Sequence, residues 1–67
     1  MDDEHNHSGA LLTVSEAAEH LGYAVGTIYQ KVSKGEIPHV KLGRAVRFRR
    51  SDLDAWVDSH AVEPRSA

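Results

Sequence analysis

Two short runs of helical apolar periodicity, separated by a glycine-containing turn, constrain this fold more than any other feature of the sequence. In the first run apolar residues recur at the i, i+3, i+4, i+7 spacing of an amphipathic helix, at Val14, Ala17, Ala18 and Leu21. The second run repeats that spacing at Val25, Ile28, Tyr29 and Val32. Residues 13–16 read as a capping box, and Gly22 and Gly35 supply stop signals. The spacing predicts helices over 14–21 and 25–34, arranged as a helix-turn-helix.

The next segment predicts a β-hairpin with a two-residue turn. Apolar and polar residues alternate on both sides of Gly43-Arg44, and glycine at the first turn position is typical of a type II′ turn. We expect Val40, Leu42, Val46 and Phe48 to face the core. Lys41, Arg47 and Arg49 then face outward, and Arg44 lies at the tip.

A third helix should follow the hairpin. Ser51 is a favourable N-cap residue, and acidic side chains at Asp52 and Asp54 suit the positive end of a helix. Leu53, Trp56 and Val57 form its apolar stripe, and the helix fades near His60. The predicted fold is therefore mainly α with a small β-hairpin: a winged helix-turn-helix.

The length of 67 residues allows one domain, which we place over 11–60 between disordered tails at 1–10 and 61–67. The chain has no cysteine, so a compact core must hold it without disulfides. No apolar run approaches the roughly 20 residues that a membrane span requires. We therefore expect a cytoplasmic protein.

Charge is distributed unevenly along the chain, although the net charge is only −2. Residues 1–20 carry five acids and neither Lys nor Arg, and residues 51–67 carry four acids against one Arg. Residues 21–50 instead carry seven basic side chains against Glu36. A basic middle can present a positive face to phosphates. The alternative is that these lysines and arginines are ordinary solvated surface.

Candidate DNA contacts come from the polar side of the second helix and from the hairpin. On the helix, Gln30 can bond adenine edges and Thr27 can contact a thymine methyl group or a phosphate. Arg44 suits a narrow minor groove. The alternatives are an ordinary polar helix surface and, for the hairpin, charges that discourage edge aggregation. The full candidate set is Gly26, Thr27, Gln30, Lys31, Lys34, Lys41, Arg44, Arg47 and Arg49.

The sequence gives little support for base stacking by aromatic residues, for metal binding or for catalysis. We expect Trp56 and Tyr29 to pack mainly in the core because both lie in helical apolar stripes, although the Tyr29 hydroxyl could reach a phosphate. His5 and His7 lack the further ligands that a metal site needs. The chain shows no nucleophile with its partners and no phosphate-binding loop. We expect no enzymatic activity, no cofactor and no metal.

The sequence resembles the excisionase-type helix-turn-helix family, which is related to the DNA-binding half of MerR-type regulators. The resemblance rests on the order and spacing of Leu12-Thr13-Val14-Ser15-Glu16-Ala17-Ala18, Leu21-Gly22, Thr27-Ile28-Tyr29, Gly35-Glu36-Ile37-Pro38, Gly43-Arg44 and Arg50-Ser51-Asp52-Leu53-Asp54-Ala55-Trp56. It implies a second helix in the major groove and a hairpin on the adjacent minor groove or backbone. The chain departs from the family at Ala24, where a Ser cap is common, and at Val25 and Gly26.

The resemblance also implies a function. Excisionases are accessory proteins that bind near an attachment site, often cooperatively, bend the DNA and help an integrase to excise. The implied partners are double-stranded DNA, an integrase and further copies of the chain. A stand-alone transcriptional regulator and a protein-interaction adaptor with a basic face are the alternatives.

Overall fold

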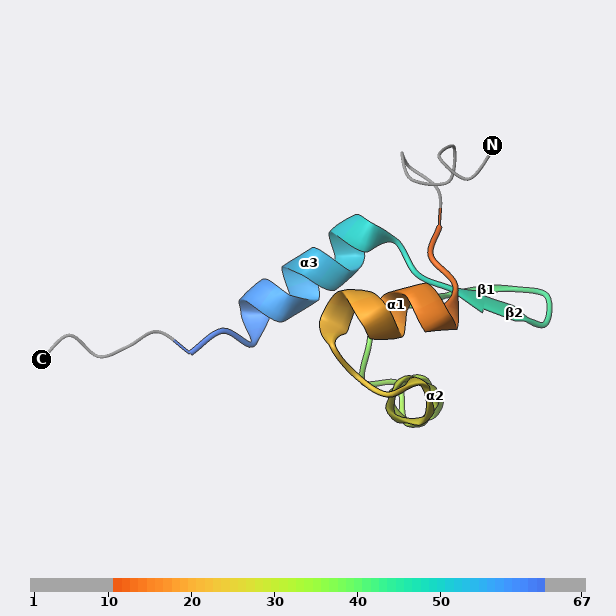
Figure 1. Cartoon of the computed structure of the whole chain (residues 1–67). Helices are drawn as coiled ribbons and strands as arrows, with labels where there is room; N and C mark the ends of the chain where they lie inside the picture. Colours follow the sequence, from red (N-terminus) through yellow and green to blue (C-terminus); the bar gives the residue numbers. More distant parts are fainter. Residues whose placement is uncertain (1–10, 63–67) are drawn as a thin grey trace, which may run out of the picture.

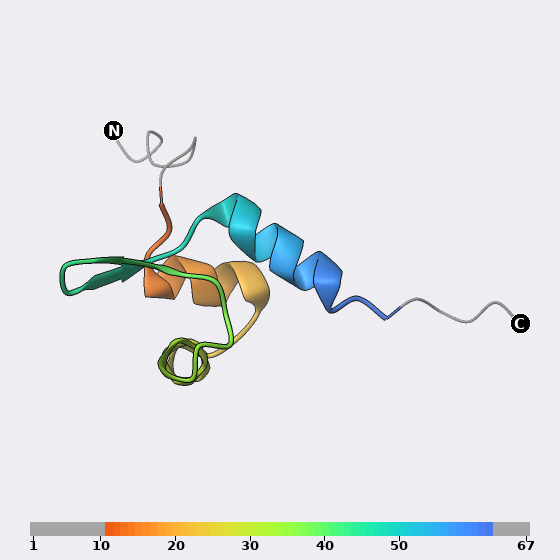
Figure 2. The same ribbon diagram turned by 180° about the vertical axis from the view of Figure 1, so that it is seen from behind.

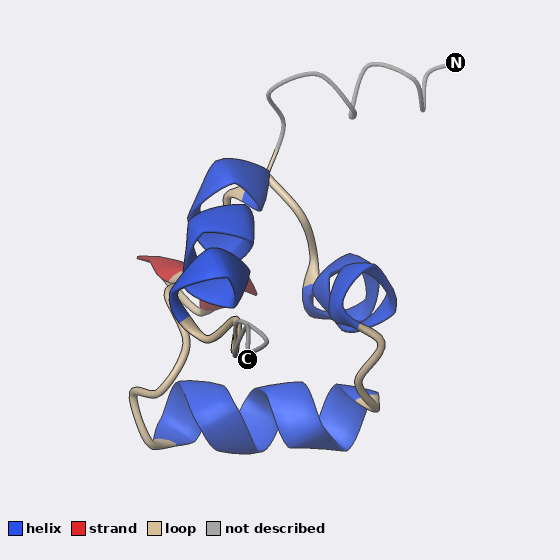
Figure 3. Ribbon diagram, turned by 90° about the vertical axis from the view of Figure 1, so that its left-hand side faces the viewer, coloured by secondary structure: helices blue, strands red, loops and turns tan. Residues whose placement is uncertain are grey.

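The computed structural model describes residues 11–62 and has the predicted winged helix-turn-helix architecture (Figure 1). Its elements are α1 Val14–Leu21, α2 Val25–Ser33, β1 Val40–Leu42, β2 Ala45–Arg47 and α3 Arg50–Ser59. In Figure 1 α2 is seen end-on and α1 from the side, and in Figure 3 the reverse holds. The two helices therefore cross at a steep angle. The hairpin projects from one end of the helical body (Figure 2). The segments 1–10 and 63–67, expected to be tails, lie outside the described residues.

Helix α1 has the predicted bounds because both of its ends are fixed locally. Thr13 N–H donates to Glu16 Oε1 at 2.9 Å, and Glu16 N–H donates to Thr13 Oγ1 at 3.1 Å, which completes the capping box. Gly22 ends the helix with a left-handed φ of 76°. Since this backbone conformation is strained for other residues, the turn into α2 begins where the glycine stands.

The core consists of seven buried apolar side chains drawn from every part of the described chain. These are Val14, Ala17, Ala18, Ile28, Ile37, Phe48 and Leu53. Leu12, Leu21, Val32, Val46 and Trp56 pack around them, half-buried. The two alanines of α1 are both buried in this cluster, and their small side chains leave room for neighbouring elements to pack against the helix.

The hairpin has the predicted two-residue turn, and Val46 and Phe48 face the core as predicted, but the predicted facing of the β1 side chains is wrong. The register pairs Val40 with Arg47, Lys41 with Val46 and Leu42 with Ala45. Directly paired residues share a face, so a two-residue turn places even-numbered residues of β1 beside odd-numbered residues of β2. Val46 and Phe48 therefore face the core on the side of Lys41, whereas Leu42 is 53% exposed.

A short bridge extends the hairpin on its β2 side. Leu12 N–H donates to the Phe48 carbonyl at 2.7 Å, and Phe48 N–H donates back to Leu12 at 2.9 Å. The sequence placed Leu12 at the start of the fold without predicting this antiparallel pairing. The bridge holds the fully buried Phe48 in position and brings the beginning of the domain beside the linker that enters α3.

Helix α3 begins earlier than predicted. Arg49 occupies the N-cap position, makes no side-chain cap hydrogen bond, and accepts the first helical bond from Leu53 N–H at 3.1 Å. The predicted N-cap at Ser51 is wrong, because the helix begins at Arg50 and Ser51 is already its second residue. Val57, expected in the apolar stripe, is 43% exposed.

Candidate nucleic-acid interface

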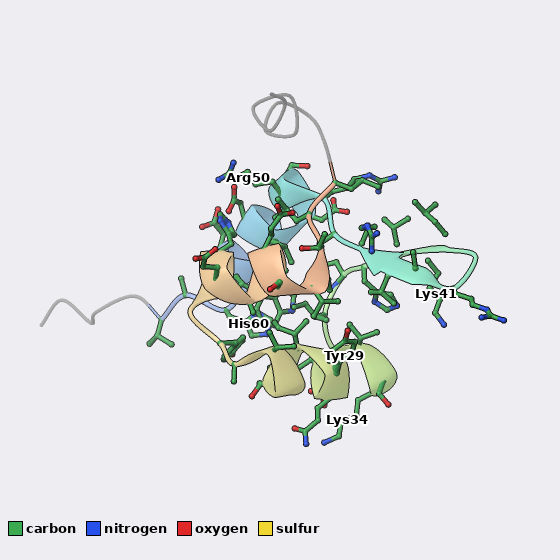
Figure 4. The ribbon with its side chains drawn as sticks, turned by 45° about the vertical axis from the view of Figure 1, so that its right-hand side comes forward. Tyr29, Lys34, Lys41, Arg50 and His60 are labelled. Carbon is green, nitrogen blue, oxygen red and sulfur yellow. The ribbon has the colours of Figure 1, made fainter. Side chains whose placement is uncertain are left out.

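The outer side of α2 is the best-defined polar helix face of the domain. Ile28 is completely buried, and the residues opposite it on the helix are Gly26, Gln30 and Ser33, all exposed. Lys34, the C-cap residue, is also exposed and points away from the body of the domain (Figure 4). The sequence missed Ser33 as a member of this face, although its spacing from Gly26 and Gln30 follows the helical period.

Tyr29 and Val25 do not join the core, contrary to prediction. Tyr29 is 55% exposed and Val25 is 41% exposed. The reason is geometric: in an α-helix Tyr29 lies about 100° around the axis from Ile28. A domain of this size covers only the narrow strip of α2 around Ile28 and Val32. Tyr29 consequently flanks the exposed face and adds an aromatic side chain to it.

Two candidate residues of α2 lie at the opposite flank of this face. Thr27 is half-buried. The Lys31 ammonium lies 3.8 Å from Glu36 Oε1 and 5.4 Å from the centre of the Tyr23 ring, and its side chain is only 25% exposed. Lys31 is thus directed back toward the domain, away from Gln30 and Ser33.

The hairpin adds basic side chains to the side of the domain on which α2 lies. Lys41 is exposed and projects from the edge of the hairpin nearer α2, as Figure 4 shows. Arg44 is exposed at the turn, where Gly43 has a φ of 63°. The left-handed conformation required at the turn is thus met by a glycine, as predicted. We call the residues Gly26, Gln30, Ser33, Lys34, Lys41 and Arg44 the front face.

Three further arginines of the described residues occupy a different surface. Arg47 pairs with Val40 on the hairpin face opposite Lys41, and its Nη1 donates to the Val46 carbonyl at 2.9 Å. Arg49 Nη1 lies 3.3 Å from Asp52 Oδ2. Arg50 lies on the far side of α1 from α2 (Figure 4). We call Arg47, Arg49 and Arg50 the back patch; the structure therefore divides the basic candidates between two surfaces.

Gly26 and Ala24 at the start of α2 have no evident structural role that requires their residue types. A Cβ added at Gly26 would meet no atom within 4 Å, and its φ is not left-handed. Ala24 occupies the N-cap and makes no side-chain hydrogen bond. The first turn of α2 is therefore less stable than a Ser-capped, Ala-containing turn would be, and its backbone is open to close approach.

The described residues show neither a metal-binding cluster nor a membrane-spanning helix. Within residues 11–62 no group of three or more His, Asp or Glu side chains is placed to hold a metal ion. None of the helices in the same range is long and apolar enough to cross a bilayer. His20 Nε2 lies 2.8 Å from Asp54 Oδ1, so this pair connects α1 to α3 on the surface.

Comparisons with known proteins agree with the fold. Residues 11–61 match the family described as "Helix-turn-helix domain". A protein of Saccharopolyspora erythraea described as "Probable excisionase" is 46% identical over 46 residues, which cover 69% of this chain and 47% of that protein. The chain thus spans about half the length of this relative. No solved structure matches it significantly. The family match, the excisionase-like relative and the fold together show that this chain belongs to the excisionase-type helix-turn-helix family, a DNA-binding and not a catalytic family.

Proposed function

We propose that the chain binds double-stranded DNA through the front face and serves as an accessory factor for excision. The observation that carries the proposal is the common orientation of Lys34 on α2 and Lys41 on the hairpin, both of which point to the side away from α1 (Figure 4). A helix and a hairpin that present cations to one side can contact a major groove and the neighbouring backbone together.

Each residue of the front face suits a different part of the duplex. Gln30 can bond an adenine edge, and Thr27 at the flank can reach a thymine methyl group or a phosphate. Lys34 and Lys41 neutralise phosphates, and Arg44 enters the minor groove at the hairpin tip. Gly26 lets the helix backbone approach the groove closely. Lys31 contributes less than the sequence suggested, because it pairs with Glu36.

The excision role draws on the relative, whose description names it a probable excisionase. By analogy, the chain binds beside an attachment site in the bacterial cell, bends the DNA and recruits an integrase. A single front face with one Gln and three cations gives modest affinity, so copies that bind side by side would strengthen occupancy. Bending, the integrase and self-association are all parts of this proposal.

A DNA-binding titration with matched arginine variants tests the proposed face. Fluorescence anisotropy on a duplex containing the attachment region should show that Arg44→Ala and Lys34→Ala weaken binding by about three- to tenfold each. Arg50→Ala removes the same charge from the other side of the domain and should leave the affinity unchanged. Equal losses for Arg44→Ala and Arg50→Ala would contradict the front face.

The excision role needs a second assay. Purified integrase and attachment-site substrates should show excision that depends on this chain, and integration that does not require it. The Arg44→Ala protein should reduce excision in parallel with DNA affinity. DNA binding with no effect on excision would refute the accessory role and leave DNA binding as the supported function.

A further inference from the structure

The back patch is a second basic surface, separate from the front face. Arg49 and Arg50 are exposed, and Arg47 is half-buried on the outer side of the hairpin. Because Phe48 is completely buried, its neighbours Arg47 and Arg49 point away from the core. Asp52 contacts Arg49 and offsets part of this charge. Because the patch has three arginines, it still keeps a net positive charge.

The chain enters the domain beside this patch. The mutual hydrogen bonds of Leu12 and Phe48 fix an antiparallel register, which places Leu11 opposite Arg49. Leu11 therefore lies beside Arg49, and ten residues precede it in the sequence. They include three acids, Asp2, Asp3 and Glu4, and neither Lys nor Arg.

Residues 1–10 are long enough to reach the back patch, and their charge is opposite to that of the patch. Glu4 lies seven residues before Leu11, and an extended chain covers at most about 25 Å over that length. Attachment to the domain also keeps the acids at a high effective concentration near the arginines. We propose that residues 1–10 dock on the back patch through Asp2, Asp3 and Glu4. The segment acts as a built-in polyanion that shields the patch from nucleic acid and leaves the front face as the DNA-binding surface.

Amide NMR spectra of the full chain test the docking without DNA. The variant D2N/D3N/E4Q should shift the amides of Arg47, Arg49, Arg50 and Ser51 relative to the natural sequence, and salt at about 0.5 M should remove the difference. The control D58N/E63Q removes acids near the other end of the chain and should leave those amides unchanged. Shifts confined to residues 1–10, or centred on Gln30, Lys34 and Arg44, would overturn the proposal.

The shielding is tested separately, by measuring the affinity for DNA. This test rests on the proposed DNA-binding function. On a duplex of unrelated sequence, D2N/D3N/E4Q should bind about three- to tenfold more tightly than the natural chain at low salt. That gain should disappear when R49Q/R50Q is added. A gain that persists in the combined variant would refute the shielding. Failure of every variant to bind DNA would refute the proposed function, while the NMR result would still decide the docking.

Discussion

Phe48 lies in the core and Trp56 packs against its edge, so the structure gives these two aromatic residues different roles. Phe48 is completely buried, whereas Trp56 is half-buried and its Nε1 donates to the Glu36 carbonyl at 3.1 Å. Trp56 therefore ties α3 to the segment after α2 by a directed bond as well as by packing. The core role expected from its apolar stripe is confirmed only as packing against the edge of the core.

This difference predicts an order of stabilities. Phe48→Leu removes buried apolar area and should lower the free energy of unfolding by about 2 kcal/mol. Trp56→Phe removes one hydrogen bond whose acceptor belongs to the exposed residue Glu36, and should cost about 1 kcal/mol. Urea unfolding followed by circular dichroism would measure both. A larger loss for Trp56→Phe would contradict the assigned roles.

Among the elements, α1 is held at its start by a local motif. Thr13→Ala should therefore lower the free energy of unfolding by about 1 kcal/mol, because it removes the acceptor for Glu16 N–H. Ser15→Ala changes an exposed residue of the same turn and should have almost no effect. Thermal unfolding of the two variants would distinguish them, and equal midpoints would show that the capping box adds no stability.

Helix α2 offers the opposite case, in which local stability is low where the proposed ligand approaches. Gly26→Ala should raise the free energy of unfolding by about 0.5–1 kcal/mol, because alanine favours the helix and its Cβ meets open space. The same methyl group should weaken DNA binding by keeping the backbone away from the groove. Unchanged affinity in the stabilised variant would show that α2 does not approach DNA at Gly26.

Element positions were predictable from the sequence where local chemistry determines them. The capping box, the three positive-φ glycines and the apolar period locate α1, α2 and the hairpin turn to within a residue. Alternation within each strand alone assigns the wrong face to β1. The predicted two-residue turn already fixes how the strands pair, and this pairing puts Leu42 and Val46 on opposite faces. By contrast, the exposure of Tyr29 depends on how few elements pack against α2, which its own period cannot show.

At the scale of the whole molecule, the basic side chains that look continuous in the sequence separate into two surfaces. Among the described residues, Lys34 and Lys41 lie on the front face with Arg44 at the hairpin turn, whereas Lys31 pairs with Glu36, and Arg47, Arg49 and Arg50 form the back patch. The net charge of −2 therefore conceals two cationic surfaces, of which the front face is the one that we propose for DNA. The number of phosphates that this side can neutralise is a property of the folded molecule.

The salt dependence of DNA binding measures that number. With three cations on the front face, the slope of log K against log salt concentration should be about −3, because each neutralised phosphate contributes about −0.9. Contacts from all six basic residues expected from the sequence would instead give about −5. Arg44→Ala should reduce the slope by about one unit, while Arg50→Ala should leave it unchanged. A wild-type slope near −5 would mean that the back patch also binds the duplex, which would contradict a one-sided interface.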